Sequence, residues 1–133
     1  MKTSPPIPAP APGEQTETLA FLSSGAAFGL ASPPRRIDTH AAIVFLCPDR
    51  AWKLKRAVRL PYLDFSTPAL RERALAAELA LNRRTAPMLY RALHPVRRGK
   101  TGQLSIGGAG ETVDWLLEMT RFPDGALLDE MAA

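Results

Sequence analysis

Residues 63–87, LDFSTPALRERALAAELALNRRTAP, decide the fold. Thr67 is suited to cap a helix, and Pro68 is suited to its first turn. The residues that follow are nearly all strong helix formers, until Pro87 prevents the helix from continuing. The sequence therefore predicts a long helix over residues 68–84.

A β-hairpin is predicted directly before this helix. Residues 41–47 form an apolar run rich in strand-forming side chains, and Pro-Asp-Arg at 48–50 has turn character. Apolar and basic residues then alternate, as in a strand with two different faces. We therefore expect strands at 41–47 and 51–57.

The remaining elements surround this centre. Apolar spacing predicts a short helix at 16–28, and two further strands are expected at 89–97 and 112–122. The glycine-rich segment 97–111 between them indicates a turn or a short extra hairpin, and another helix begins within 126–131. The order predicts an α+β fold, with an antiparallel sheet of four or five strands and one major helix packed across it.

Composition limits the setting of this domain. The chain has 133 residues and a net charge of +4. Its first stretch contains five prolines before position 13, so residues 1–15 are expected to form a disordered tail ahead of a single domain at 16–133. That stretch is unlike a secretory signal, and no segment approaches the roughly 20 apolar residues of a membrane span. With one cysteine, Cys47, the sequence favours the cytoplasm.

Two lysines are the first candidates for a site. Lys53 and Lys55 share one face of the predicted strand, while Trp52 and Leu54 share the other. Such a lysine can hold phosphate oxygens as a point charge. The alternative is a solvated strand face.

A helix carboxylate is the second candidate. Glu78 lies at the margin of the apolar stripe of helix 68–84 and has no cation three or four residues away. Glu72 lies almost opposite that stripe. A glutamate that faces a strand lysine would fix the lysine in place for phosphate binding. The alternative is a surface glutamate.

Three stretches together resemble a known family. They are HAAIVFLCPDRAWKLKRAVRLPYLDFST, ELALNRRTAP and VDWLLEMTRFPDGALL. They are similar to the start of the bacterial aminoglycoside phosphotransferase-like proteins, which are often fused to a P-loop ATPase-like domain. The resemblance covers roughly residues 36–131 and implies a kinase-like N-terminal lobe that binds ATP.

The resemblance implies individual roles. Lys53 would contact phosphate, with Lys55 as the close alternative, and Glu78 would pair with that lysine. The linker between lobes, whose backbone would contact adenine, corresponds to Met119, Thr120, Arg121 and Phe122.

The sequence also departs from the family pattern. No glycine-rich loop precedes the lysine strand, and neither an HGD motif nor a P-loop motif is present. The aspartate that accepts the hydroxyl proton and the magnesium ligands of the family would lie beyond the linker. We therefore expect a fragment truncated before the C-terminal lobe, with an incomplete ATP site and no catalytic residue. Such a lobe should expose apolar surface around Leu116, Leu127 and Leu128, where a C-terminal lobe or a P-loop ATPase domain would dock.

Two other functions stay open at this stage. One is a non-catalytic regulatory or interaction domain. The other is a small basic nucleic-acid binder, which is disfavoured because its arginines are spread over several elements and its aromatic residues lie in apolar patterns. The two histidines and one cysteine lie far apart in the sequence, so no metal site is expected.

Overall fold

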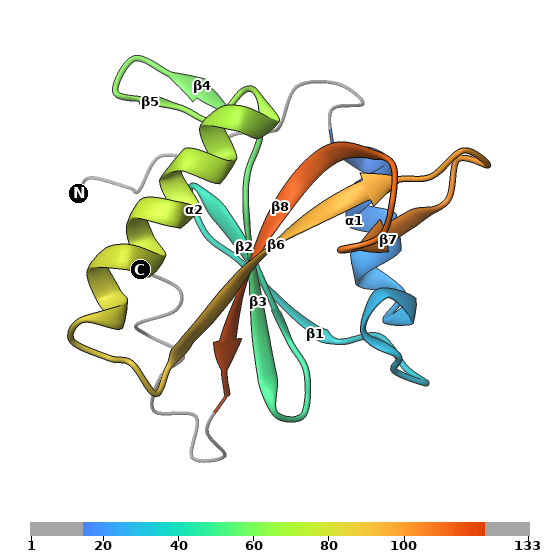
Figure 1. Ribbon diagram of the computed structural model, residues 1–133, viewed down its shortest axis with the longest axis horizontal. Helices are drawn as coiled ribbons and strands as arrows, with labels where there is room; N and C mark the ends of the chain where they lie inside the picture. The colour runs from blue at the N-terminus through green and yellow to red at the C-terminus, as the bar shows by residue number, and fades with distance from the viewer. Residues whose placement is uncertain (1–14, 122–133) are drawn as a thin grey trace, which may run out of the picture.

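The computed structural model describes residues 15–121. These residues form an α+β fold around a six-stranded antiparallel sheet in the order β1-β2-β3-β8-β6-β7 (Figure 1). The predicted class is confirmed, but the sheet has six strands and not four or five. The elements are α1 (Thr16–Ser23), the 3₁₀ helix η1 (Ala26–Phe28), β1 (Arg35–Asp38), β2 (Ala42–Leu46), β3 (Arg50–Lys55), β4 (Arg59–Leu60), β5 (Leu63–Asp64), α2 (Pro68–Arg83), β6 (Tyr90–Arg98), β7 (Leu104–Ile106) and β8 (Glu111–Thr120).

Helix α2 follows the prediction closely. The side chain of Thr67 accepts a hydrogen bond from the backbone N–H of Leu70 at 3.2 Å, and Pro68 occupies the first turn. Figure 1 shows the helix along one side of the sheet, where it packs on β6 and β8. The predicted packing of one major helix across the sheet is therefore confirmed.

The first helix is shorter than the predicted 16–28. Helix α1 ends at Ser23, and η1 follows after Gly25, whose φ is 85°. A Cβ at Gly25 would lie 2.6 Å from the carbonyl oxygen of Ser32. A left-handed residue in such close contact breaks the helix, so the chain turns back toward β1.

Four short strands were not predicted individually. Strand β1 has the sequence RRID and is mostly exposed, so it shows no apolar alternation that would mark it as a strand. It forms an edge of the sheet, with Ile37 opposite Val44. Strands β4 and β5 form a separate two-stranded hairpin. Strand β7 provides the short extra hairpin that the glycine-rich segment allowed.

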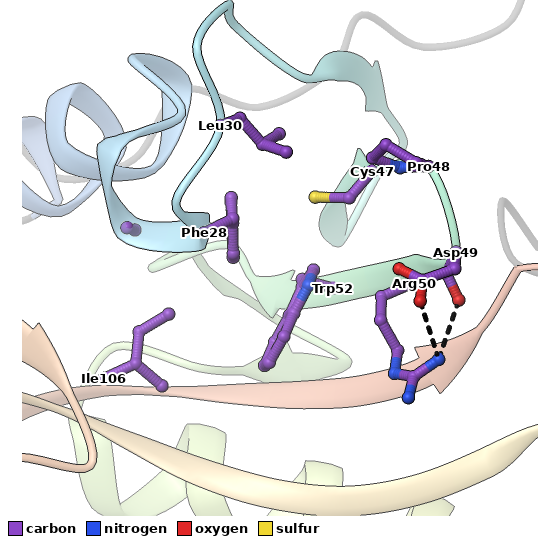
Figure 2. A pocket seen from close by; sticks show the side chains of 9 residues that line it. Phe28, Leu30, Cys47, Pro48, Asp49, Arg50, Trp52 and Ile106 are labelled. Atoms are coloured by element: carbon purple, nitrogen blue, oxygen red, sulfur yellow. Dashed lines mark hydrogen bonds and ion pairs between the residues drawn. The ribbon is translucent and has the colours of Figure 1, made fainter.

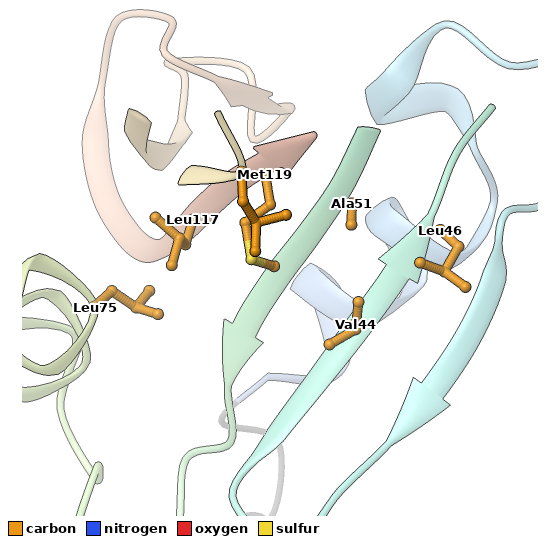
Figure 3. Close-up of a cluster of buried hydrophobic side chains, with 7 residues drawn as sticks. Val44, Leu46, Ala51, Leu75, Leu117 and Met119 are labelled. Atoms are coloured by element: carbon orange, nitrogen blue, oxygen red, sulfur yellow. The ribbon is translucent and has the colours of Figure 1, made fainter. Parts of the chain in front are cut away.

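The sheet carries an apolar core on both faces. The cluster on the α2 side contains Val44, Leu46, Ala51, Leu75, Leu89, Leu117 and Met119 (Figure 3). The cluster on the α1 side contains Leu22, Ile43, Phe45, Leu54, Val96 and Leu116. The cluster on the α1 side lies on the face of β3 that carries Trp52 and Leu54, as expected for a core face. The cluster on the α2 side lies on the face that carries Lys53 and Lys55, so the lysine face is not purely polar.

This second core also corrects the predicted docking surface. Leu116 has an exposed fraction of 0%, so it does not contribute to an exposed apolar surface. Leu127 and Leu128 lie outside the described residues, as does the expected helix start at 126–131.

The assignment of Gln15 to a disordered tail is wrong. Gln15 is 1% exposed and belongs to the folded part, while residues 1–14 lie outside the described part of the chain. Within residues 15–121, neither helix combines the length and the apolar character that a membrane crossing requires.

Candidate functional site

A cluster of three charged side chains lies between β3 and α2. The Lys53 Nζ atom is 3.0 Å from Glu78 Oε2, and the Lys55 Nζ atom is 3.4 Å from Glu78 Oε1. One carboxylate therefore contacts both ammonium groups, one with each oxygen. The predicted proximity of Glu78 to a strand lysine is confirmed. Among the described residues, Glu72 takes no part in these ion pairs.

The fold positions these groups from both sides. Lys53 is opposite Val44 on β2 and opposite Leu117 on β8, so its strand is held by neighbours on both edges. On α2, Leu75 is fully buried in the core, and Glu78 follows three residues later on the same side of the helix. The packing of Leu75 thus directs Glu78 toward the sheet.

The cluster contains two cations and one anion, and its side chains are largely buried. The side chains of Lys53, Lys55 and Glu78 are 7%, 14% and 16% exposed. Burial and the charge of Lys53 lower the pKa of Lys55 below its ordinary value of 10.5, against the opposing effect of Glu78. The Lys55 ammonium also lies 5.3 Å from the centre of the Phe65 ring. Two cations and one anion leave an excess positive charge that favours an anionic ligand.

A second buried network, which sequence reasoning missed, lies next to this cluster. The Arg71 Nε atom donates to Asp114 Oδ1 at 2.9 Å, and Gln15 Nε2 donates to Asp114 Oδ2 at 2.8 Å. Gln15 also donates to the Lys55 carbonyl at 2.9 Å and accepts from the Ala57 N–H at 2.9 Å. The one signal in the sequence was Asp114 itself, a carboxylate within the apolar stretch VDWLL at 113–117.

This network anchors the end of β3 that carries Lys55. Arg71 and Asp114 are both 0% exposed. Burial raises the pKa of Asp114, while Arg71 and the amide of Gln15 oppose that shift. Through Gln15, the start of α1 is tied to β3, and through Arg71, the first turns of α2 are tied to β8.

The predicted linker residues have contacts that differ from those of the charged cluster. Met119 is 1% exposed and packs in the core. The Thr120 N–H donates to the Leu89 carbonyl, and the Arg121 N–H donates to the Asp49 carbonyl. These two amides are therefore already bonded to carbonyl groups within residues 15–121. Phe122 lies outside the described residues.

The two histidines contact other side chains of the fold, and the cysteine is buried. His40 Nε2 lies 2.6 Å from the hydroxyl of Tyr62, and His94 Nε2 lies 2.8 Å from Glu118 Oε1. Burial raises the pKa of the Cys47 thiol to about 11. Across residues 15–121, histidine, cysteine and acidic side chains form no group of three that could hold a metal ion.

Three of the arginines considered for nucleic-acid binding have defined surroundings. Arg56 is only 7% exposed, Arg36 pairs with Asp38, and Arg98 pairs with Glu17. These three arginines lie on different elements, and each is buried or paired with a carboxylate.

Comparisons with known proteins found relatives of uncharacterized function. The uncharacterized proteins Rv2004c of Mycobacterium tuberculosis and Mb2027c of Mycobacterium bovis are each 45% identical to this chain over 53 residues. The match covers 40% of this chain and 11% of each relative, so it spans about a tenth of their length. No family model matches the chain. No solved structure matches it significantly.

Proposed function

We propose that residues 15–121 form the nucleotide-binding lobe of an aminoglycoside phosphotransferase-like, kinase-like protein. The observation that carries this proposal is the contact between Lys53 on β3 and Glu78 on α2 at 3.0 Å. In protein kinases, a strand lysine that contacts phosphate is held by a glutamate of the following helix. The same pair of residue types, on a strand and on the next helix along the chain, supports this role for Lys53 and Glu78.

The electrostatics support an anionic ligand in particular. A lysine that serves only to pair with a glutamate needs one carboxylate, and here two lysines share one. Burial lowers the pKa of Lys55, and repulsion by the neighbouring Lys53 ammonium group lowers it further. A phosphate group of ATP would relieve this repulsion and complete the charge balance.

Lys53 is the better candidate for the phosphate contact. Its neighbours on β2 and β8 fix its backbone, and its ammonium group is the one at 3.0 Å from Glu78. Lys55 lies at the end of its strand, and its ammonium group is near the Phe65 ring. In this proposal Lys55 contributes charge, and Lys53 contributes the contact.

The proposal predicts binding without transfer for these 133 residues. Phosphoryl transfer depends on an aspartate that accepts the hydroxyl proton and on ligands that hold magnesium between the phosphates. The sequence contains no HGD motif that could supply them. A C-terminal lobe or a P-loop ATPase domain would provide these groups in trans or in a longer chain.

The test measures the binding of a fluorescent ATP analogue to the 133-residue chain at low salt. We expect Lys53→Ala to weaken binding at least tenfold, while Lys100→Ala, a matched change of an exposed turn lysine, leaves it unchanged. Radiolabelled ATP should give no transfer to an aminoglycoside. Equal losses in both variants would show that binding follows net charge alone, and would contradict the proposal.

A further inference from the structure

A pocket lies on the sheet face opposite Lys53 and Glu78. It has a volume of about 370 Å³ and lies between η1 and the turn that joins β2 to β3 (Figure 2). Its lining residues are Ala27, Phe28, Leu30, Cys47, Pro48, Asp49, Arg50, Trp52 and Ile106. The nucleotide proposal gives no role to this pocket, because the sheet separates it from the lysines.

Aromatic contacts hold the floor of the pocket in place. The rings of Phe28 and Trp52 are stacked, with centroids 5.2 Å apart and planes inclined by 30°. The ring of His94 lies against Trp52 at 5.4 Å, and His94 is itself bonded to Glu118. A ligand would therefore meet a formed apolar wall, so little ordering of side chains would oppose binding.

The thiol of Cys47 adds an uncharged surface to this wall. Figure 2 shows its sulfur pointing from the β2–β3 turn toward the space in front of Phe28 and Leu30. Because burial raises the pKa of this thiol to about 11, it is protonated near neutral pH. It presents a soft, polarizable and neutral group to a ligand.

The charged groups at the edge of the pocket balance one another. Arg50 Nε donates to Glu118 Oε2 at 2.8 Å, and one terminal nitrogen of Arg50 donates to the Asp49 carbonyl at 3.0 Å and lies 3.6 Å from its carboxylate. A charged ligand would lose its hydration without gaining an unpaired counter-ion. The pocket chemistry therefore selects a neutral ligand.

We propose that this pocket binds a small, neutral, planar aromatic molecule of one or two rings. Its volume of about 370 Å³ falls in the range of roughly 300–1,000 Å³ that is typical of ligand pockets. An apolar cavity of about 150 Å³ already holds benzene. A two-ring molecule would fill the pocket, with its edge on Trp52 and its faces against Ile106 and Leu30.

The experiment titrates the 133-residue chain with indole and records ¹H–¹⁵N spectra. The side-chain N–H of Trp52 and the amides of η1 should shift, while the side-chain N–H of Trp115, which packs on the α2 side, should not. Indole should bind at least tenfold more tightly than anionic indole-3-acetate or cationic tryptamine. Ala27→Met, which fills the pocket, should weaken binding at least tenfold, whereas Ala69→Met on the exposed side of α2 should not.

Alkylation of Cys47 provides a second measurement that needs no variant. The chain contains one cysteine, so mass spectrometry follows its slow reaction with a neutral maleimide directly at pH 9, where more of the thiol is ionised than at neutral pH. Indole should slow this reaction, and the charged analogues at the same concentration should not. Unchanged spectra and an unchanged alkylation rate would overturn the proposal, as would equal binding of all three compounds. The outcome is independent of Lys53→Ala, so it is separable from the nucleotide test.

Discussion

Helix α2 presents two charged side chains to the sheet, seven residues apart, and their surroundings differ in one decisive way. Arg71 meets Asp114 in a sealed pair, in which one cation faces one anion and both are 0% exposed. Glu78 meets two lysines in a cluster whose members are 7–16% exposed. The first arrangement is balanced and sealed, whereas the second is unbalanced and only partly buried.

This difference suggests a structural role for Arg71 and a binding role for the cluster around Glu78, on the same helix. A sealed and balanced pair has no capacity for another partner, so its role is to hold α1, α2, β3 and β8 together. A partly buried cluster with an excess positive charge can accept an anion. The comparison therefore predicts that changes at the two places differ in size and in their response to phosphate.

The largest expected effect comes from Asp114→Ala. This change leaves the Arg71 guanidinium without its carboxylate in a fully buried place, so the free energy of unfolding should fall by about 3–5 kcal/mol. Urea denaturation measures the loss. Asp49→Ala, whose side chain is 81% exposed, is the matched control and should change stability little.

A double variant sharpens this first prediction. Arg71→Met combined with Asp114→Leu removes both charges, and apolar replacement of a buried pair is often close to neutral. The double variant should therefore be more stable than Asp114→Ala alone. If Asp114→Ala were no more destabilising than Asp49→Ala, the view of this pair as the anchor of the lobe would be wrong.

The second prediction concerns Glu78→Gln. Two ammonium groups would remain close together without their carboxylate, which should lower the free energy of unfolding by about 1–3 kcal/mol. Because the cluster is only partly buried, inorganic phosphate should restore much of this loss by taking the place of the carboxylate. Thermal unfolding with and without phosphate measures the effect.

Two controls accompany that measurement. Glu72→Gln, on the same helix but outside the cluster, should change neither the melting temperature nor the phosphate response. Asp114→Ala should not be rescued by phosphate, because its site is sealed. Rescue of both variants to the same extent would indicate a general salt effect and would remove the distinction between the two places.

The third prediction separates the two lysines. Lys53→Met should weaken the binding of the ATP analogue about tenfold, equivalent to about 1.4 kcal/mol, whereas Lys55→Met should weaken it less than about threefold. The reason is that Lys53 is proposed to contact phosphate, and Lys55 to supply only charge. The opposite order would assign the phosphate contact to Lys55.

The sequence was sufficient for the features that depend on neighbouring residues. Thr67 and Pro68 mark the start of α2, and the border position of Glu78 places it toward a strand lysine. The predicted strands of the sheet centre were also found, because their apolar patterns are local.

Features that depend on distant residues could not be predicted in the same way. Gln15 and Asp114 are 99 positions apart, and no local pattern indicates that they meet. Likewise, β1 is an edge strand with polar residues, which becomes a strand only through its pairing with β2. The buried network of Gln15, Arg71 and Asp114 and the core on the α1 side of the sheet both arise from such tertiary contacts.

The smallest expected effect is a pH dependence that Lys55 contributes. Its pKa is lowered in the folded state by burial and by Lys53, so between that value and 10.5 the unfolded chain binds more protons at this residue than the folded chain. The free energy of unfolding of the wild type should therefore rise with pH in this interval, relative to Lys55→Met, which has no proton to lose. At lower pH the folded wild type carries the full desolvation penalty of the charged ammonium group, and this penalty disappears as pH approaches 10.5. Urea denaturation of both proteins from pH 7 upward should show the stability difference, variant minus wild type, becoming smaller, with Lys100→Met as the baseline. A difference that grows with pH would mean that Glu78 stabilises the charged form of Lys55 more than burial and Lys53 oppose it, so the pKa of Lys55 would be raised in the folded state and the view of strained, mutually repelling lysines would be wrong.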